Sequence, residues 1–82
     1  GYEGHVITLP DVSERRSRTR AAMDLLIGTR DMIRADGLVC RIVSGGGTGT
    51  YDITGAIDGI DEVQAGTYAL MDSFYHTVRP EF

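Results

Sequence analysis

Apolar positions recur at helical spacing between residues 14 and 35, and this is the clearest pattern in the sequence. The helix that it predicts carries these side chains on one face: Ala22, Leu25, Leu26, Thr29 and Ile33. Spacings of three and four are those of an amphipathic helix packed against a core. Asp11 or Ser13 can cap its first turn, and Gly37 follows its last turn, where a residue in the left-handed conformation commonly ends a helix.

Four arginines crowd the opening turns of this helix, at Arg15, Arg16, Arg18 and Arg20. Positive charge is unfavourable at a helix N-terminus, so we expect these turns to be exposed to solvent and to fray. A solvated helix face is the preferred interpretation of the arginines, and a binding patch is the alternative.

Three short runs rich in β-branched residues predict strands at residues 6–9, 38–44 and 60–65. The second run is almost continuously apolar, as in a strand that is covered on both faces of a parallel sheet. Residues 51–56 leave room for one or two helical turns, and a helical pattern resumes over residues 67–76. The long helix between the first two strands predicts that they are parallel, with a right-handed connection.

This order of elements predicts an α/β fold that is incomplete by itself. A parallel sheet needs both faces covered, and two helices with a short helical segment cannot cover three strands and also pair both sheet edges. We therefore expect residues 1–82 to be part of a larger α/β sheet or barrel, without a complete domain.

Composition restricts the classes of partner. The 82 residues are 41% apolar and 24% charged, as in an ordinary small globular protein. The net charge of -4 argues against a nucleic acid or an anionic membrane as partner. No apolar run approaches the roughly 20 residues that span a bilayer, and no secretory signal pattern opens the sequence, so we expect a cytoplasmic protein. The single cysteine, Cys40, is expected to be a small buried apolar residue.

The sequence contains no lysine, because all eight basic residues are arginine. Chemistry that needs a side-chain amine therefore cannot be completed by these residues.

The strongest functional signal directly follows the second predicted strand, as Ser-Gly-Gly-Gly-Thr-Gly-Thr at positions 44–50. Glycines let successive backbone N–H groups converge into an anion-binding nest, and the hydroxyls of Ser44, Thr48 and Thr50 can add donors. The segment predicts a phosphate site, although it lacks the lysine of a Walker loop and the third glycine of the dinucleotide fingerprint. A flexible glycine turn is the alternative.

The next predicted strand also ends in a glycine turn, with the sequence QAGTY at positions 64–68. In a (β/α)8 barrel, a phosphate site is frequently built from the loops after the last two strands. Two successive glycine turns at strand ends therefore favour a barrel of this kind.

The segment VSGGGTGTYDITGAIDGIDEVQAGTYALMD closely resembles the end of the barrel in pyridoxal-phosphate (PLP) enzymes of the D-threonine aldolase and D-serine dehydratase group. Their N-terminal domain is of the alanine-racemase type, and the opening GYEGH is similar to the exit of its sixth strand. The resemblance covers nearly the whole chain. It implies a fragment of a PLP-binding (β/α)8 TIM barrel, from about the end of the sixth strand to the eighth strand and its following helix.

The resemblance also implies roles for individual residues. Those implied to contact the cofactor, mostly through its phosphate, are Gly46, Gly47, Thr48, Gly49, Gly66, Thr67 and Tyr2. Gln64 is expected to contact the cofactor or a residue beside it, since a polar side chain that points into a barrel needs a partner. No catalytic or metal-ligating residue is expected here, because the family's Schiff-base lysine lies on the first barrel strand and its divalent-metal ligands lie in a C-terminal β-domain.

The function implied for the parent protein is that of a PLP-dependent lyase that cleaves D-3-hydroxy amino acids into glycine and an aldehyde. Its substrate would be a small D-amino acid, its metal divalent, and its assembly a homodimer. The rest of the barrel and the C-terminal β-domain would be this chain's partners, and the fragment alone would be inactive. Two alternatives stay open, a D-serine dehydratase-like ammonia-lyase on the same scaffold and a non-catalytic phosphate-binding module.

Overall fold

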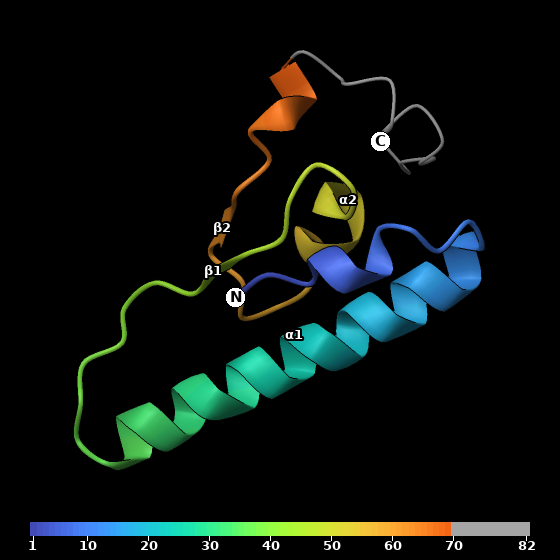
Figure 1. Ribbon diagram of the computed structural model, residues 1–82. Coiled ribbons are helices and arrows are strands. Elements are labelled where there is room, and N and C mark those ends of the chain that lie inside the picture. The colour runs from blue at the N-terminus through green and yellow to red at the C-terminus, as the bar shows by residue number, and fades with distance from the viewer. Residues whose placement is uncertain (70–82) are drawn as a thin grey trace.

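A computed structural model describes residues 1–69 of the chain. Its elements are η1 (Gly4–Val6), α1 (Val12–Ala35), β1 (Ser44–Gly45), α2 (Tyr51–Thr54), β2 (Glu62–Val63) and η2 (Thr67–Ala69), where η denotes a 3-10 helix. The long helix α1 forms one layer, and η1, α2 and the two strands lie together on one side of it (Figure 1). The buried apolar residues of the core are Val6, Met23, Val43, Ile53 and Ile57.

The helix α1 confirms the predicted long helix, and it begins and ends at capping motifs. The Asp11 carboxylate accepts hydrogen bonds from the N–H groups of Ser13 at 2.8 Å and Glu14 at 3.3 Å, so Asp11 is the N-cap. At the other end, Gly37 has a φ of +84°, and the N–H of Leu38 donates to the carbonyl of Ile33 at 3.2 Å. These features form a Schellman motif, which needs a residue that tolerates the left-handed conformation.

The buried face of α1 differs from the predicted one. Its fully buried residues are Arg15, Thr19 and Met23. Within the predicted stripe, Ala22 and Leu26 are half-buried, but three members are exposed, namely Leu25, Thr29 and Ile33. The prediction fails because α1 packs against η1 and α2, and these elements set which side of the helix turns inward.

The opening turns of α1 are not uniformly exposed. Arg15 is only 1% exposed, and its Nη1 donates a hydrogen bond to the carbonyl of Leu9 at 3.0 Å. Arg18 and Arg20 are exposed as expected, and Arg18 pairs with Glu14 at 3.2 Å. The expectation of a fully solvated arginine face is therefore wrong at Arg15, because the segment before the helix folds back and supplies an acceptor for its guanidinium.

The two strands are parallel, with Ser44 opposite Glu62 and Gly45 opposite Val63. The N–H of Asp61 donates to the carbonyl of Val43 at 2.8 Å, and the N–H of Gln64 donates to the carbonyl of Gly45 at 3.2 Å. The predicted helical turns at residues 51–56 are confirmed by α2, which lies in the connection between the strands. The predicted strand at residues 60–65 is confirmed in its centre by β2.

The predicted strand at residues 6–9 is wrong. The chain forms η1 and a turn there, with the N–H of Val6 bonded to the carbonyl of Glu3 and the N–H of Leu9 bonded to the carbonyl of Val6. These local bonds satisfy the backbone without a partner strand. The predicted parallel pairing of this segment and its right-handed connection therefore do not occur.

The predicted strand at residues 38–44 joins the sheet only at its end. Leu38, Val39 and Ile42 are 62%, 77% and 65% exposed, against the expectation of a strand covered on both faces. Cys40 is half-buried. Within residues 1–69, the pairing partner β2 reaches only the last residues of this segment, so the earlier ones have no strand beside them.

The predicted helix at residues 67–76 begins with η2, and the rest of it lies outside the described residues. No helix in residues 1–69 is long and apolar enough to cross a membrane.

Candidate functional site

The backbone at Gly1 lies beside β1, on the edge opposite β2. The amino group of Gly1 donates to the carbonyl of Ser44 at 2.7 Å. The carbonyls on either side of Ser44, those of Val43 and Gly45, accept instead from the β2 segment. Since carbonyls alternate in direction along a strand, β1 has a backbone neighbour on each edge.

The first two residues of the chain lie alongside the glycine loop, which is defined here as residues 45–49. A Cβ atom placed on Gly45 would lie 3.3 Å from the carbonyl oxygen of Gly1. One placed on Gly47 would lie 3.1 Å from Cε2 of the Tyr2 ring. A side chain at either position would therefore be in tight contact with the N-terminal residues, which would have to shift slightly to admit it.

The backbone of the glycine loop requires glycine most strictly at Gly46. Its φ is +75°, in the region that residues with a side chain rarely adopt. A Cβ atom there would also lie 3.0 Å from Cγ2 of Thr54, at the end of α2. The chain thus turns sharply out of β1 and passes directly against the following helix.

Four successive N–H groups of this turn, at Gly46, Gly47, Thr48 and Gly49, donate no hydrogen bond to any acceptor in the described part of the chain. All four residues are buried. Buried backbone N–H groups are paired in the great majority of proteins. The turn therefore has four N–H donors that no acceptor in residues 1–69 uses. A phosphate site at this turn stays a prediction.

The three hydroxyls expected to add donors have different partners. The hydroxyl of Ser44 donates to Glu62 at 3.0 Å and accepts from the side-chain amide of Gln64 at 2.7 Å. The hydroxyl of Thr50 donates to the carboxylate of Glu3. The hydroxyl of Thr48 is buried and has no partner within residues 1–69. Of these three hydroxyls, that of Thr48 is therefore the one without a hydrogen-bond partner in the described part of the chain.

The second predicted glycine turn follows β2. Gly66 and Thr67 are exposed, and a Cβ atom on Gly66 would meet nothing within 4 Å. Their N–H groups also donate to no acceptor in the described residues. The bond between the N–H of Gln64 and the carbonyl of Gly45 holds the two strand exits side by side. The structure therefore places the two turns on neighbouring strands, as expected.

Gln64 directly follows β2 and lies next to Ser44 of β1. Its side-chain amide donates to Ser44, as above, and to the carboxylate of Glu62. The prediction for Gln64 allowed a contact with the cofactor or with a residue beside it. Its bond to Ser44 joins the side chain to the residue that precedes the glycine loop. Its contact with a cofactor stays a prediction.

Sequence reasoning missed Glu3, whose carboxylate is buried beneath α2. Glu3 is 1% exposed, and its Oε1 accepts hydrogen bonds from the hydroxyls of Thr50 and Thr54. A single acid in a short polar segment gives no local signal of burial. The one sequence feature that could have drawn attention to Glu3 is its place in the GYEGH block, next to Tyr2.

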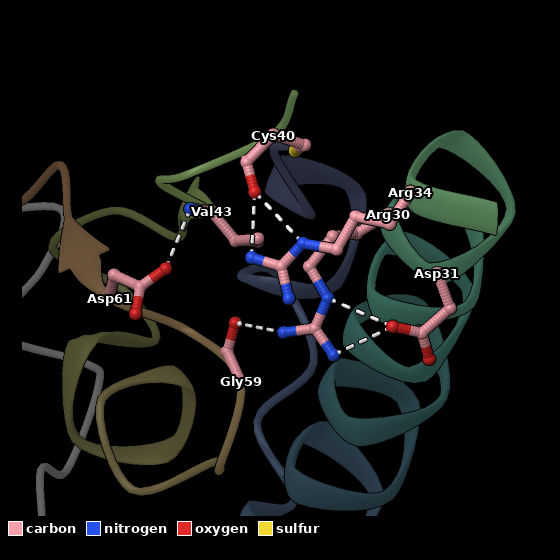
Figure 2. Close-up of polar contacts among 7 residues, drawn as sticks. All are labelled: Arg30, Asp31, Arg34, Cys40, Val43, Gly59 and Asp61. Atoms are coloured by element: carbon pink, nitrogen blue, oxygen red, sulfur yellow. Dashed lines mark hydrogen bonds and ion pairs between the residues drawn. The ribbon is translucent and has the colours of Figure 1, made fainter. Parts of the chain in front are cut away.

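A separate polar network joins the second half of α1 to the segments that lead into β1 and β2 (Figure 2). Arg34 donates to the carbonyl of Cys40 at 2.6 and 2.9 Å, and Arg30 donates to the carbonyl of Gly59 at 3.3 Å. The N–H of Val43 donates to the carboxylate of Asp61 at 2.8 Å. The two arginines thus hold the segments that lead into β1 and β2, which positions the glycine turns at the far ends of those strands.

Within the described residues, no three His, Cys, Asp or Glu side chains are arranged so that they could hold a metal ion.

Comparison with known proteins gives three similar chains, while no protein-family model matches. The chain is 34% identical over 74 residues to the 3-hydroxy-D-aspartate aldolase of Paracoccus denitrificans. The matched residues are 90% of this chain and 19% of that protein. It is also 34% identical over 74 residues to a D-threonine aldolase of an Arthrobacter species, with coverages of 90% and 20%.

The crystal structure of D-threonine aldolase from Filomicrobium marinum is similar in fold, with a TM-score of 0.86 and 34% identity. The similarity covers 99% of this chain and 22% of that one. The resemblance to D-threonine aldolase found in the sequence is therefore confirmed in both sequence and fold, over an α/β segment with a small parallel sheet. The chain spans about a fifth of the length of the relatives it matches.

Proposed function

We propose, from this similarity to the D-threonine and 3-hydroxy-D-aspartate aldolases, that the chain is part of a PLP-dependent lyase that cleaves D-3-hydroxy amino acids. Within that enzyme its share is to bind the phosphate of the cofactor. The observation that carries the proposal is that sequence and fold point to the same class of enzyme along almost all of this chain.

The residues of the glycine loop fit a phosphate group. The N–H groups of four buried residues, without acceptors in residues 1–69, and the buried hydroxyl of Thr48 supply neutral donors around one turn. Neutral donors of this kind bind an oxyanion without a lysine, which the sequence does not contain. The N–H groups of Gly66 and Thr67 supply a second set from the adjacent strand exit.

Tyr2 is proposed to lie at the side of the bound cofactor. Cε2 of its ring lies 3.1 Å from the position of a Cβ atom on Gly47, and Tyr2 is 66% exposed, so much of this side chain is accessible next to the glycine loop. An aromatic face at this position orients a planar ring by stacking. When bound, PLP supplies an electron sink for the charge left on Cα when the Cα–Cβ bond breaks.

The proposed location is the last part of a (β/α)8 barrel, from the end of the sixth strand to the eighth. Three backbone segments in consecutive order support it, since Gly1 lies beside β1 and β1 lies beside β2. Phosphate sites of such barrels are frequently built after the last strands. The exposed apolar side chains at Leu38, Val39 and Ile42 would then be covered by other parts of the barrel.

The remaining machinery would come from other parts of the enzyme. The resemblance places the Schiff-base lysine on the first barrel strand and the divalent-metal ligands in a C-terminal β-domain, and this chain contains no lysine. Residues 1–82 alone are therefore proposed to bind phosphate without catalysing cleavage. The homodimeric assembly and the identity of the D-amino acid belong to the same proposal.

The test uses the whole enzyme that contains this chain, incubated with PLP, a divalent cation and D-threonine. Formation of glycine and an aldehyde in equal amounts is the expected result. Release of ammonia with a 2-oxo acid would instead identify a dehydratase on the same scaffold. Tight binding of PLP without turnover of any D-3-hydroxy amino acid would leave only a binding module and would contradict the lyase assignment.

A further inference from the structure

Glu3 is a buried carboxylate whose hydrogen-bond partners within residues 1–69 belong to the segment that follows the glycine loop. Its Oε1 accepts hydrogen bonds from the hydroxyls of Thr50, which precedes α2, and of Thr54, which ends it. A buried carboxylate is costly unless hydrogen bonds satisfy it. The two hydroxyls satisfy Oε1, whereas the buried Oε2 has no hydrogen-bond partner within residues 1–69. Glu3 is 1% exposed, so these two hydroxyls are the hydrogen-bond donors that the described residues supply to its carboxylate.

Both hydroxyl partners are also in contact with the glycine loop. The N–H of Thr50 donates to the carbonyl of Gly47 at 3.2 Å. Thr54 packs against Gly46, at 3.0 Å from the position of a Cβ atom there. The Glu3 carboxylate thus holds two residues that together contact the turn at its beginning and its centre.

The direction of these bonds also matters for the ligand. A threonine hydroxyl has one proton, so Thr50 and Thr54 give theirs to Glu3 and keep none for a phosphate oxygen. The hydroxyl of Thr48 and the backbone N–H groups of the turn are left as donors. The arrangement separates residues that shape the turn from residues that would bind the anion.

We propose that Glu3 is a positioning residue that sets the conformation of the glycine loop through Thr50 and Thr54, and thereby the affinity of the enzyme for the phosphate of its cofactor. This inference rests on the proposed function. It predicts that removing the carboxylate weakens recognition of the phosphate in particular, because Thr50 and Thr54 contact the glycine loop, whereas the contact proposed for the cofactor ring is made by Tyr2.

The experiment measures, in the whole enzyme, the dissociation constants of PLP and of pyridoxal, which lacks the phosphate. We compare the unmodified enzyme with Glu3→Ala, Glu3→Gln and the surface control Glu14→Ala. Glu3→Ala should weaken PLP binding by about tenfold or more, in line with the loss of hydrogen bonds to a charged group, and change pyridoxal binding less than about twofold. Glu3→Gln keeps an oxygen acceptor for both hydroxyls and should restore PLP binding to within about threefold.

A second pair of variants keeps the test decisive if Glu3→Ala does not fold. Thr50→Val and Thr54→Val keep the side-chain shape and remove one donor each, and each should lower the affinity for PLP more than that for pyridoxal. Equal losses for both ligands in these variants, or in Glu3→Ala, would show a general structural role and overturn the proposal. An affinity for PLP that is the same in these variants as in the unmodified enzyme would also overturn the proposal.

The unmodified enzyme separates this inference from the proposed function. If it binds PLP no better than pyridoxal, the phosphate assignment itself is wrong. If it prefers PLP and the variants keep the same preference, only the role of Glu3 is wrong.

Discussion

Gly46 and Thr54 are in direct contact across the turn that leaves β1. A Cβ atom on Gly46 would lie 3.0 Å from Cγ2 and 3.1 Å from Cβ of Thr54. The same glycine has a φ of +75°. Two independent constraints, one steric and one conformational, therefore require glycine at this position, and they belong to the turn that we propose binds phosphate.

Replacement of Gly46 by alanine should destabilise the cofactor-free protein by about 1–3 kcal/mol, because an L-residue is strained at this φ and its methyl group meets Thr54. The measurement is thermal or denaturant unfolding. The matched control is Gly28→Ala, an exposed helix position where a Cβ atom meets nothing within 4 Å. That change should stabilise the protein by up to about 1 kcal/mol. Destabilisation by the control and not by Gly46→Ala would contradict the assigned backbone conformations.

Replacement of Gly66 by valine should separate cofactor binding from folding. The position is exposed and a Cβ atom there has open space around it, so the midpoint of thermal unfolding should change little. If the Gly66 N–H faces the phosphate, a branched side chain beside it should weaken PLP binding by about tenfold or more. The exposed turn position Ala56 offers the control, as Ala56→Val. Unchanged affinity for PLP in the Gly66 variant would remove this residue from the site.

Replacement of Arg15 by alanine should destabilise the protein by about 2–4 kcal/mol. The change removes a buried side chain and leaves the carbonyl of Leu9 without its donor at 3.0 Å. Arg18→Ala, three positions along the same helix, removes an exposed ion pair with Glu14 and should cost less than about 0.5 kcal/mol. Unfolding in urea distinguishes the two variants. Similar losses in both would mean that Arg15 is solvated after all.

Replacement of Asp11 by alanine should cost about 1 kcal/mol, because the first N–H groups of α1 lose their side-chain acceptor. Asp11→Asn keeps a capping oxygen and should retain most of that stability. The sequence left Ser13 as an alternative cap, so Ser13→Ala is the informative comparison and should have a small effect. A larger loss at Ser13 than at Asp11, measured by thermal unfolding, would reverse the assignment.

Features that depend on neighbouring residues were predictable from the sequence. A cap at Asp11 or Ser13, the left-handed Gly37 and the short helix at residues 51–56 were all predicted, because capping bonds and glycine conformations are decided within a few positions of the chain. The glycine turns after β1 and β2 belong to the same group. Their order along the chain also sufficed to place them on adjacent parallel strands.

Which side chains are buried could not be predicted from the sequence. The inward face of α1, the buried Arg15 and the carboxylate of Glu3 depend on which distant segments pack together. Glu3 receives its hydrogen bonds from Thr50 and Thr54, which are 47 and 51 positions further along the chain. No periodicity in the sequence connects residues that far apart. Local hydrogen bonding and backbone conformation are encoded over a few residues, whereas the partners that bury a side chain are brought together only when the whole chain is folded.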